Sequence, residues 1–203
     1  MTKPTTNNTI QPTSSLTLFL LAMFAIFFLS SCATLKKDDC IEGNWSGIGF
    51  NDAAAGLKSA SQFGAHSKAC AKYKITPNVA LYQSGYNKGL LQFCTTTNGY
   101  QHGTDKKEYY GVCPNTTQAK FLKGYLAGLD TAAIEISEEL VDLRHKRLRA
   151  ISRHHRMKHK KDSDGKKIKK MADRIDSLES RIDSLRSDRR QLRRWHNYWA
   201  PKL

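Results

Sequence analysis

The chain has 203 residues, five cysteines and a formal net charge of +15. A strongly basic protein binds anions, and nucleic acid is the usual partner for such a charge balance. The amino-terminal segment excludes nucleic acid here, because it predicts that the protein is exported from the cytoplasm.

Residues 1–31 predict a lipoprotein signal peptide that is cleaved. Leu16–Leu29 is an uncharged run of fourteen residues, whereas spanning a bilayer takes about 20 apolar residues. The sequence Leu29-Ser30-Ser31-Cys32 then resembles the bacterial lipobox, in which the cysteine is lipidated and becomes the first residue of the mature chain. A simple membrane anchor with an incidental cysteine is the alternative.

The lipidated Cys32 predicts both the location and the partners of the mature protein. Acyl chains hold a protein stably on a membrane, and Ala33 is not the aspartate that retains lipoproteins in the inner membrane. We therefore expect a lipid anchor in the cell outer membrane, facing the periplasm. Cleavage removes only Lys3 from the charge of +15, leaving +14, so peptidoglycan, lipopolysaccharide or an acidic envelope protein are the expected partners. Residues 32–39 would form a short polar tether.

Four cysteines follow the lipidation site, and in an exported domain an even number of cysteines indicates disulfides. Four cysteines allow three connectivities. Asn98-Gly99 predicts a tight turn, which favours pairing of Cys94 with Cys113 across a loop of about 20 residues and stabilisation by about 3 kcal/mol. Cys40 then pairs with Cys70. A metal site is the weaker alternative, because no Cys-x-x-Cys spacing occurs.

Glycines and aromatic residues at helical spacing predict a small helical domain over residues 40–128. A short helix capped by Asn44 is expected first, and Pro77 is expected to open a later one. In this later helix Tyr82-x-x-Gly85-Tyr86-x-x-Gly89-Leu90 combines an aromatic stripe with small residues. Phe121-x-x-Gly124-Tyr125-x-x-Gly128-Leu129 has the same pattern, so two glycine-notched helices are expected to pack face to face.

Together these positions resemble a family of proteobacterial lipoproteins known as domain of unknown function 2799. The resemblance covers about residues 40–128 and implies a Gram-negative envelope location, but no activity. The residues that carry it are Cys40, Trp45, Ile48, Gly49, Asp52, His66, Cys70, Pro77, Tyr82, Gly85, Gly89, Leu90, Phe93, Cys94, Asn98, Gly99, Tyr100, Gly103, Tyr110, Gly111, Val112, Cys113, Pro114, Phe121, Tyr125 and Gly128.

The domain contains four plausible acid–base residues, namely Asp52, His66, His102 and Glu108. No nucleophile elbow, metal pair or phosphate loop accompanies them, so we predict no enzyme and no cofactor. His66 is interpreted as a surface or hydrogen-bonded histidine. A periplasmic enzyme that uses Asp52 and His66 is the distant alternative.

Residues 129–203 predict a long antiparallel α-hairpin. Thr116 or Thr117 can cap a helix that runs into this region without a proline, and residues 162–165 are turn formers that lack the later ligands of an EF-hand. The second helix has a heptad stripe, formed by Ile168, Met171, Ile175, Leu178, Ile182 and Leu185. The aromatic residues at its end are expected to return to the domain: Trp195, Tyr198 and Trp199. A homodimeric coiled coil is the competing arrangement.

The tip of this hairpin is strongly basic. Residues 144–170 contain thirteen Lys or Arg, four His and only two acids. The predicted anion-binding residues are Arg153, Arg156, Lys160, Lys161, Lys166 and Lys167. A solvated helix surface is the plainer interpretation of such a charge run. His155 and His159 make a feasible metal-binding pair, but two ligands are too few, so no metal site is predicted.

The sequence therefore predicts a mainly α protein in which a disulfide-stapled helical domain continues into a coiled-coil hairpin. Its expected function is non-enzymatic binding or structural support in the envelope. An accessory subunit or inhibitor of an envelope complex is the alternative.

Overall fold

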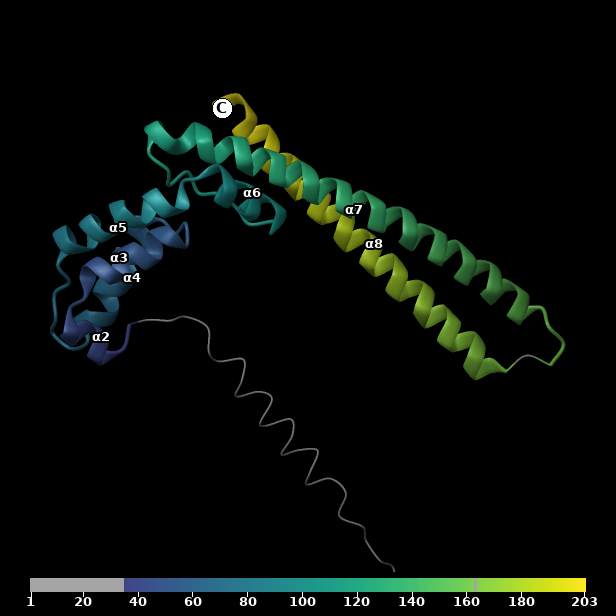
Figure 1. Cartoon of the computed structure of the whole chain (residues 1–203). Helices are drawn as coiled ribbons and strands as arrows, with labels where there is room; N and C mark the ends of the chain where they lie inside the picture. Colours follow the sequence, from purple (N-terminus) through teal and green to yellow (C-terminus); the bar gives the residue numbers. More distant parts are fainter. Residues whose placement is uncertain (1–34, 163) are drawn as a thin grey trace, which may run out of the picture.

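The computed structural model describes residues 35–162 and 164–203, and these residues form helices and loops without strands (Figure 1). The predicted mainly α fold is confirmed. The elements in chain order are α2 (Lys37–Glu42), α3 (Trp45–Ala54), α4 (Ser59–Ala71), α5 (Val79–Phe93), α6 (Thr96–Thr104), α7 (Asn115–Lys158), α8 (Gly165–Trp199) and the 3-10 helix η1 (Ala200–Lys202).

The predicted signal peptide over residues 1–31 and the lipidation site Cys32 lie outside the described residues. Among the helices that the structure does describe, none combines the length and the apolar character needed to cross a membrane.

Helices α3 and α5 pack so closely that their backbones touch. A Cβ atom at Gly85 would lie 1.8 Å from the carbonyl oxygen of Ser46, and one at Gly49 would lie 2.1 Å from that of Tyr82. No side chain fits at such distances, so glycine is required at both positions. The aromatic rings of Tyr82 and Tyr86 are buried around this contact.

Helices α6 and α7 repeat this arrangement. A Cβ atom at Gly124 would lie 1.9 Å from the Thr96 carbonyl oxygen, and one at Gly99 would lie 2.2 Å from the Phe121 carbonyl oxygen. The prediction of a tight turn at Asn98-Gly99 was wrong, because both residues lie inside α6. Gly99 serves close helix packing rather than a turn conformation.

The two helix pairs form an internal repeat, with α3 matching α6 and α5 matching α7. The Tyr86 hydroxyl donates to the Leu57 carbonyl oxygen at 2.6 Å, and the Tyr125 hydroxyl donates to the Lys107 carbonyl oxygen at 3.0 Å. The residue before each of these carbonyls has positive φ, 74° at Gly56 and 56° at Lys106. The expectation that α5 and α7 pack face to face was therefore wrong: each packs on its own short partner.

Both predicted disulfides are confirmed. Cys40–Cys70 joins α2 to α4, and Cys94–Cys113 joins the end of α5 to the loop before α7, each with a Cα–Cα distance of 5.6 Å. The disulfides thus attach α2, α4 and the loop before α7 to the glycine-packed pairs.

Three helix starts differ from the prediction. The predicted tether is partly helical, since α2 begins at Lys37. Helix α5 begins after Asn78, whose side chain accepts from the Leu81 N–H, rather than at Pro77. Helix α7 begins at Asn115, so that Thr116 and Thr117 lie in its first turn. The predicted Asn44 cap is confirmed, since its side chain accepts from the Gly47 N–H.

Helices α7 and α8 form the predicted antiparallel hairpin, which projects away from the rest of the molecule (Figure 1). Its seam buries apolar side chains from both helices, including Ile136, Leu140, Leu143, Ile182 and Leu185. Two ion pairs cross it: Arg181 lies 2.9 Å from Glu139, and Arg147 pairs with Glu179. These partly exposed pairs agree with the register that the buried seam sets and add little stability to it.

The hairpin and the disulfide-bonded domain share α7, which runs without a break across residues 128 and 129. At the base of the hairpin the ring of Trp199 packs on that of Tyr109, with 4.7 Å between centroids. The predicted return of the carboxyl-terminal aromatic residues is confirmed for Trp199, whereas Tyr198 is exposed.

Candidate functional site: a cationic groove on the hairpin

A cationic groove of about 690 Å³, the distal groove, lies between α7 and α8 in the half of the hairpin towards its tip. Ala150, Leu148 and Met171 contribute apolar surface, and five cations surround it. These cations are Lys146, Arg149, Arg153, Arg156 and Arg174. Because α7 supplies four of them and α8 the fifth, the groove depends on hairpin formation.

Most of this charge is not neutralised within the protein. Lys146 pairs with Asp142 at 2.6 Å. The four arginines form no ion pair with any residue that the structure describes. Guanidinium groups bind carboxylate and phosphate with paired hydrogen bonds, so this groove can hold an anionic group above an apolar floor.

The six predicted anion-binding residues are spread over the tip rather than gathered in one site. Arg153 and Arg156 line the groove. Lys160 and Lys161 lie in the turn, while Lys166 and Lys167 lie in the first turn of α8. All six are exposed, and Lys167 lies 3.6 Å from Asp164.

Sequence reasoning missed three of the groove residues: Lys146, Arg149 and Arg174. A signal existed for Arg149, because Arg149, Arg153 and Arg156 follow the i, i+4, i+7 spacing of one helix face. No such signal existed for Arg174, whose place depends on the register between α7 and α8.

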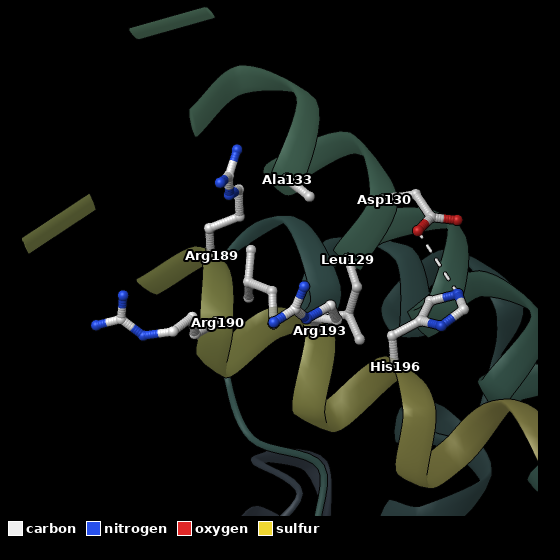
Figure 2. A pocket seen from close by; sticks show the side chains of 8 residues that line it. Leu129, Asp130, Ala133, Arg189, Arg190, Arg193 and His196 are labelled. Atoms are coloured by element: carbon white, nitrogen blue, oxygen red, sulfur yellow. Dashed lines mark ion pairs between the residues drawn. The ribbon is translucent and has the colours of Figure 1, made fainter. Parts of the chain in front are cut away.

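A second pocket, of about 370 Å³, lies at the base of the hairpin (Figure 2). Arg189, Arg190 and Arg193 line it, with Leu129 on the facing helix. Figure 2 shows Arg190 pointing away from Leu129 and the facing helix. This pocket also contains a carboxylate, that of Asp130, 3.5 Å from His196 Nε2, so it suits an anion less well than the distal groove.

The predicted acid–base pair forms a hydrogen-bonded cluster in the first helix pair. His66 Nε2 lies 2.9 Å from Asp52 Oδ2, and the Tyr82 hydroxyl donates to the same oxygen at 2.8 Å. Burial, and then the bond to Asp52, raise the pKa of Tyr82 well above its usual value. His66 is buried and hydrogen-bonded, which agrees with its interpretation from the sequence.

His102 and Glu108, the other two acid–base candidates, lie in the second helix pair. His102 Nε2 lies 3.0 Å from the main-chain oxygen of Glu108, so the carboxylate of Glu108 takes no part in this contact. The imidazole packs against the rings of Phe93 and Phe121, and burial lowers the pKa of His102. The four candidates therefore form two separate groups.

The two histidines near the tip also lie together. The rings of His155 and His159 have 4.4 Å between centroids. Within residues 35–162 and 164–203, no group of three or more His, Cys, Asp or Glu side chains is arranged to hold a metal ion.

Comparison with known proteins identifies the glycine-packed region. Residues 44–130 match the family model described as "Protein of unknown function (DUF2799)". The match covers both helix pairs of the internal repeat and ends near the base of the hairpin, so the cationic groove lies beyond it. No curated protein and no solved structure matches the chain.

Proposed function

Residues 44–130 match the model of the DUF2799 family of proteins of unknown function, and from this premise we propose that the chain is a lipid-anchored protein of the bacterial outer membrane. In this proposal Cys32 carries the lipid and the mature protein faces the periplasm. Its function is to bind anionic envelope components through the basic hairpin, without catalysing a reaction.

The distal groove is the observation that carries this proposal. Arg149, Arg153 and Arg156 line one face of α7, and Arg174 approaches from α8. Four arginines without an ion-pair partner among the described residues repel one another, so an anion that enters between them relieves this repulsion. Peptidoglycan supplies carboxylates and lipopolysaccharide supplies phosphates, which are the groups that arginine binds best.

The two polar clusters of the disulfide-bonded domain, around Asp52 and around His102, are poorly arranged for catalysis. Asp52 Oδ2 already accepts from both His66 and Tyr82, and His102 contacts a main-chain oxygen. A general base needs a free position within hydrogen-bond reach of its substrate. The hydrogen bonds of both clusters are directed within the fold.

Binding to isolated cell-wall sacculi and to vesicles that contain lipopolysaccharide tests the proposal. The full chain should cosediment with at least one of them, and added salt should weaken the binding because exposed charges are screened. Replacing Arg149, Arg153 and Arg156 with Gln should weaken it by about 100-fold at low salt, at roughly 1 kcal/mol per cation.

A matched control removes the same charge from the other pocket. Replacing Arg189, Arg190 and Arg193 with Gln lowers the net charge equally but leaves the distal groove intact, so binding should fall much less. Equal losses in the two variants would contradict a groove-specific role. Absence of binding to both preparations, with one stoichiometric protein recovered after crosslinking in cells, would instead indicate an accessory subunit or inhibitor.

A further inference from the structure

The outer face of α7 carries a regular apolar stripe. Ile134, Val141 and Leu148 are 60%, 51% and 57% exposed. Among the described residues between 129 and 192 in the hairpin, they are the only large hydrophobic residues that are exposed. They are spaced seven residues apart. Such spacing places them along one line of a helix, as in a coiled-coil seam.

This stripe is separate from the seam with α8. The seam uses Ile136, Leu140 and Leu143, which are buried. Beside the stripe, α7 forms an open groove of about 570 Å³ that is lined by Asp130, Ala133, Ile134, Ser137, Glu138 and Val141. Four residues at positions i, i+3, i+4 and i+7 make the hole that receives a side chain from a facing helix; here they are Ile134, Ser137, Glu138 and Val141.

Charges around the stripe change sign along α7. Glu135 and Glu138 lie at its base end, while Arg144 and Arg149 lie at its tip end. None of these four forms an ion pair within the described part of the chain. A parallel second helix would place acid on acid and base on base, whereas an antiparallel one places each acidic end against a basic end.

We propose that two copies of this chain pair through the α7 stripe in an antiparallel arrangement centred near Val141. In this dimer Ile134 faces Leu148 of the second copy, and Glu138 lies at the same level along the helix as Arg144 of the second copy, across the interface. Two-fold symmetry makes every such contact occur twice. The stripe meets the distal groove at Leu148, which lines both surfaces, but the pairing is argued from Ile134, Val141 and the charges beside them and does not depend on the proposed anion binding.

Sedimentation equilibrium of the full chain in a density-matched detergent tests the proposal. The wild-type chain should form a dimer in a concentration-dependent equilibrium. Val141→Lys should raise the dissociation constant by roughly 100-fold, because it places a lysine at the centre of the interface. Leu91→Lys is the matched control, since Leu91 is 71% exposed on α5, away from the stripe; it should leave the dimer intact.

Charge reversal tests the direction of pairing. Glu138→Arg and Arg144→Glu should each weaken the dimer by about tenfold, because each creates two like-charge contacts. The double variant should regain wild-type dimerisation. A wild-type chain that is monomeric at every concentration, a Val141→Lys variant that still dimerises, or a double variant weaker than both single ones would overturn the proposal. Circular dichroism on each variant establishes that it is folded.

Discussion

The two glycine-packed helix pairs share one backbone arrangement but have different polar interiors. Asp52 in the first pair and His102 in the second occupy equivalent positions. The main-chain N–H five residues later donates to the carbonyl oxygen of each: Leu57 to Asp52 at 3.0 Å, and Lys107 to His102 at 3.1 Å. The Asp52 side chain accepts hydrogen bonds from His66 and Tyr82. The His102 side chain instead packs among aromatic rings.

This difference separates what the fold requires from what it allows. Backbone contact at the glycines and a tyrosine hydroxyl bonded to the loop carbonyl occur in both pairs. The side chain that points into the interior from the last turn of the short helix differs between the pairs: it is a carboxylate, Asp52, in the first and an imidazole, His102, in the second. The framework therefore depends on small residues, and the interior polar group is a feature of each pair separately.

The largest expected effect comes from the shared glycines. Gly85→Ala and Gly124→Ala should each lower the free energy of unfolding by about 3 kcal/mol or more, because a Cβ atom would force the paired backbones apart. Urea denaturation followed by circular dichroism measures this. Gly64→Ala is the control: nothing lies within 4 Å of its Cβ position in α4, so it should stabilise by about 0.5–1 kcal/mol. Losses confined to one pair would show that the two pairs are not equivalent.

A smaller effect is expected from the polar group that only the first pair contains. Asp52→Ala should cost about 2–3 kcal/mol, because it leaves two buried donors, on His66 and Tyr82, without their acceptor. The exposed neighbour Asn51 provides the control, and Asn51→Ala should change stability by less than about 0.5 kcal/mol. If both variants unfold at the same urea concentration, the cluster contributes nothing to stability.

The smallest effect is a pH dependence that belongs to the second pair. Burial lowers the folded-state pKa of His102 below its ordinary value of 6.5. The unfolded chain therefore takes up a proton first as the pH falls through about 6.5, and stability decreases on acidification. Unfolding measured between about pH 7 and pH 5 should show a shallower loss for His102→Asn than for the wild type. An unchanged slope would contradict this assignment.

Much of the fold could be predicted because its signals are local. The even cysteine count indicated two disulfides, and the predicted pairing is correct although the Asn98-Gly99 turn that favoured it does not form. Residues 162–165 placed the turn between α7 and α8. The repeated glycine–tyrosine pattern identified α5 and α7 as similar helices. These features depend on a few neighbouring residues, which a sequence displays directly.

The remainder depends on contacts between distant segments. Asn98-Gly99 favours a turn locally, yet Gly99 is needed where α6 touches α7, and the tertiary contact overrides the local preference. Arg174 joins the distal groove only because the packing of α8 against α7 gives the hairpin this register. Neither the partner of α5 nor that of α7 could be read from periodicity, because a helix face does not specify what covers it.

The order of the disulfides bears on how the chain matures. Among the described cysteines each bond joins the two that are consecutive in the sequence, Cys40 with Cys70 and Cys94 with Cys113. A chain that is oxidised as it emerges amino end first therefore exposes each correct partner before the next cysteine appears. Of the three possible connectivities, this is the one that vectorial oxidation produces without reshuffling by thiol–disulfide exchange.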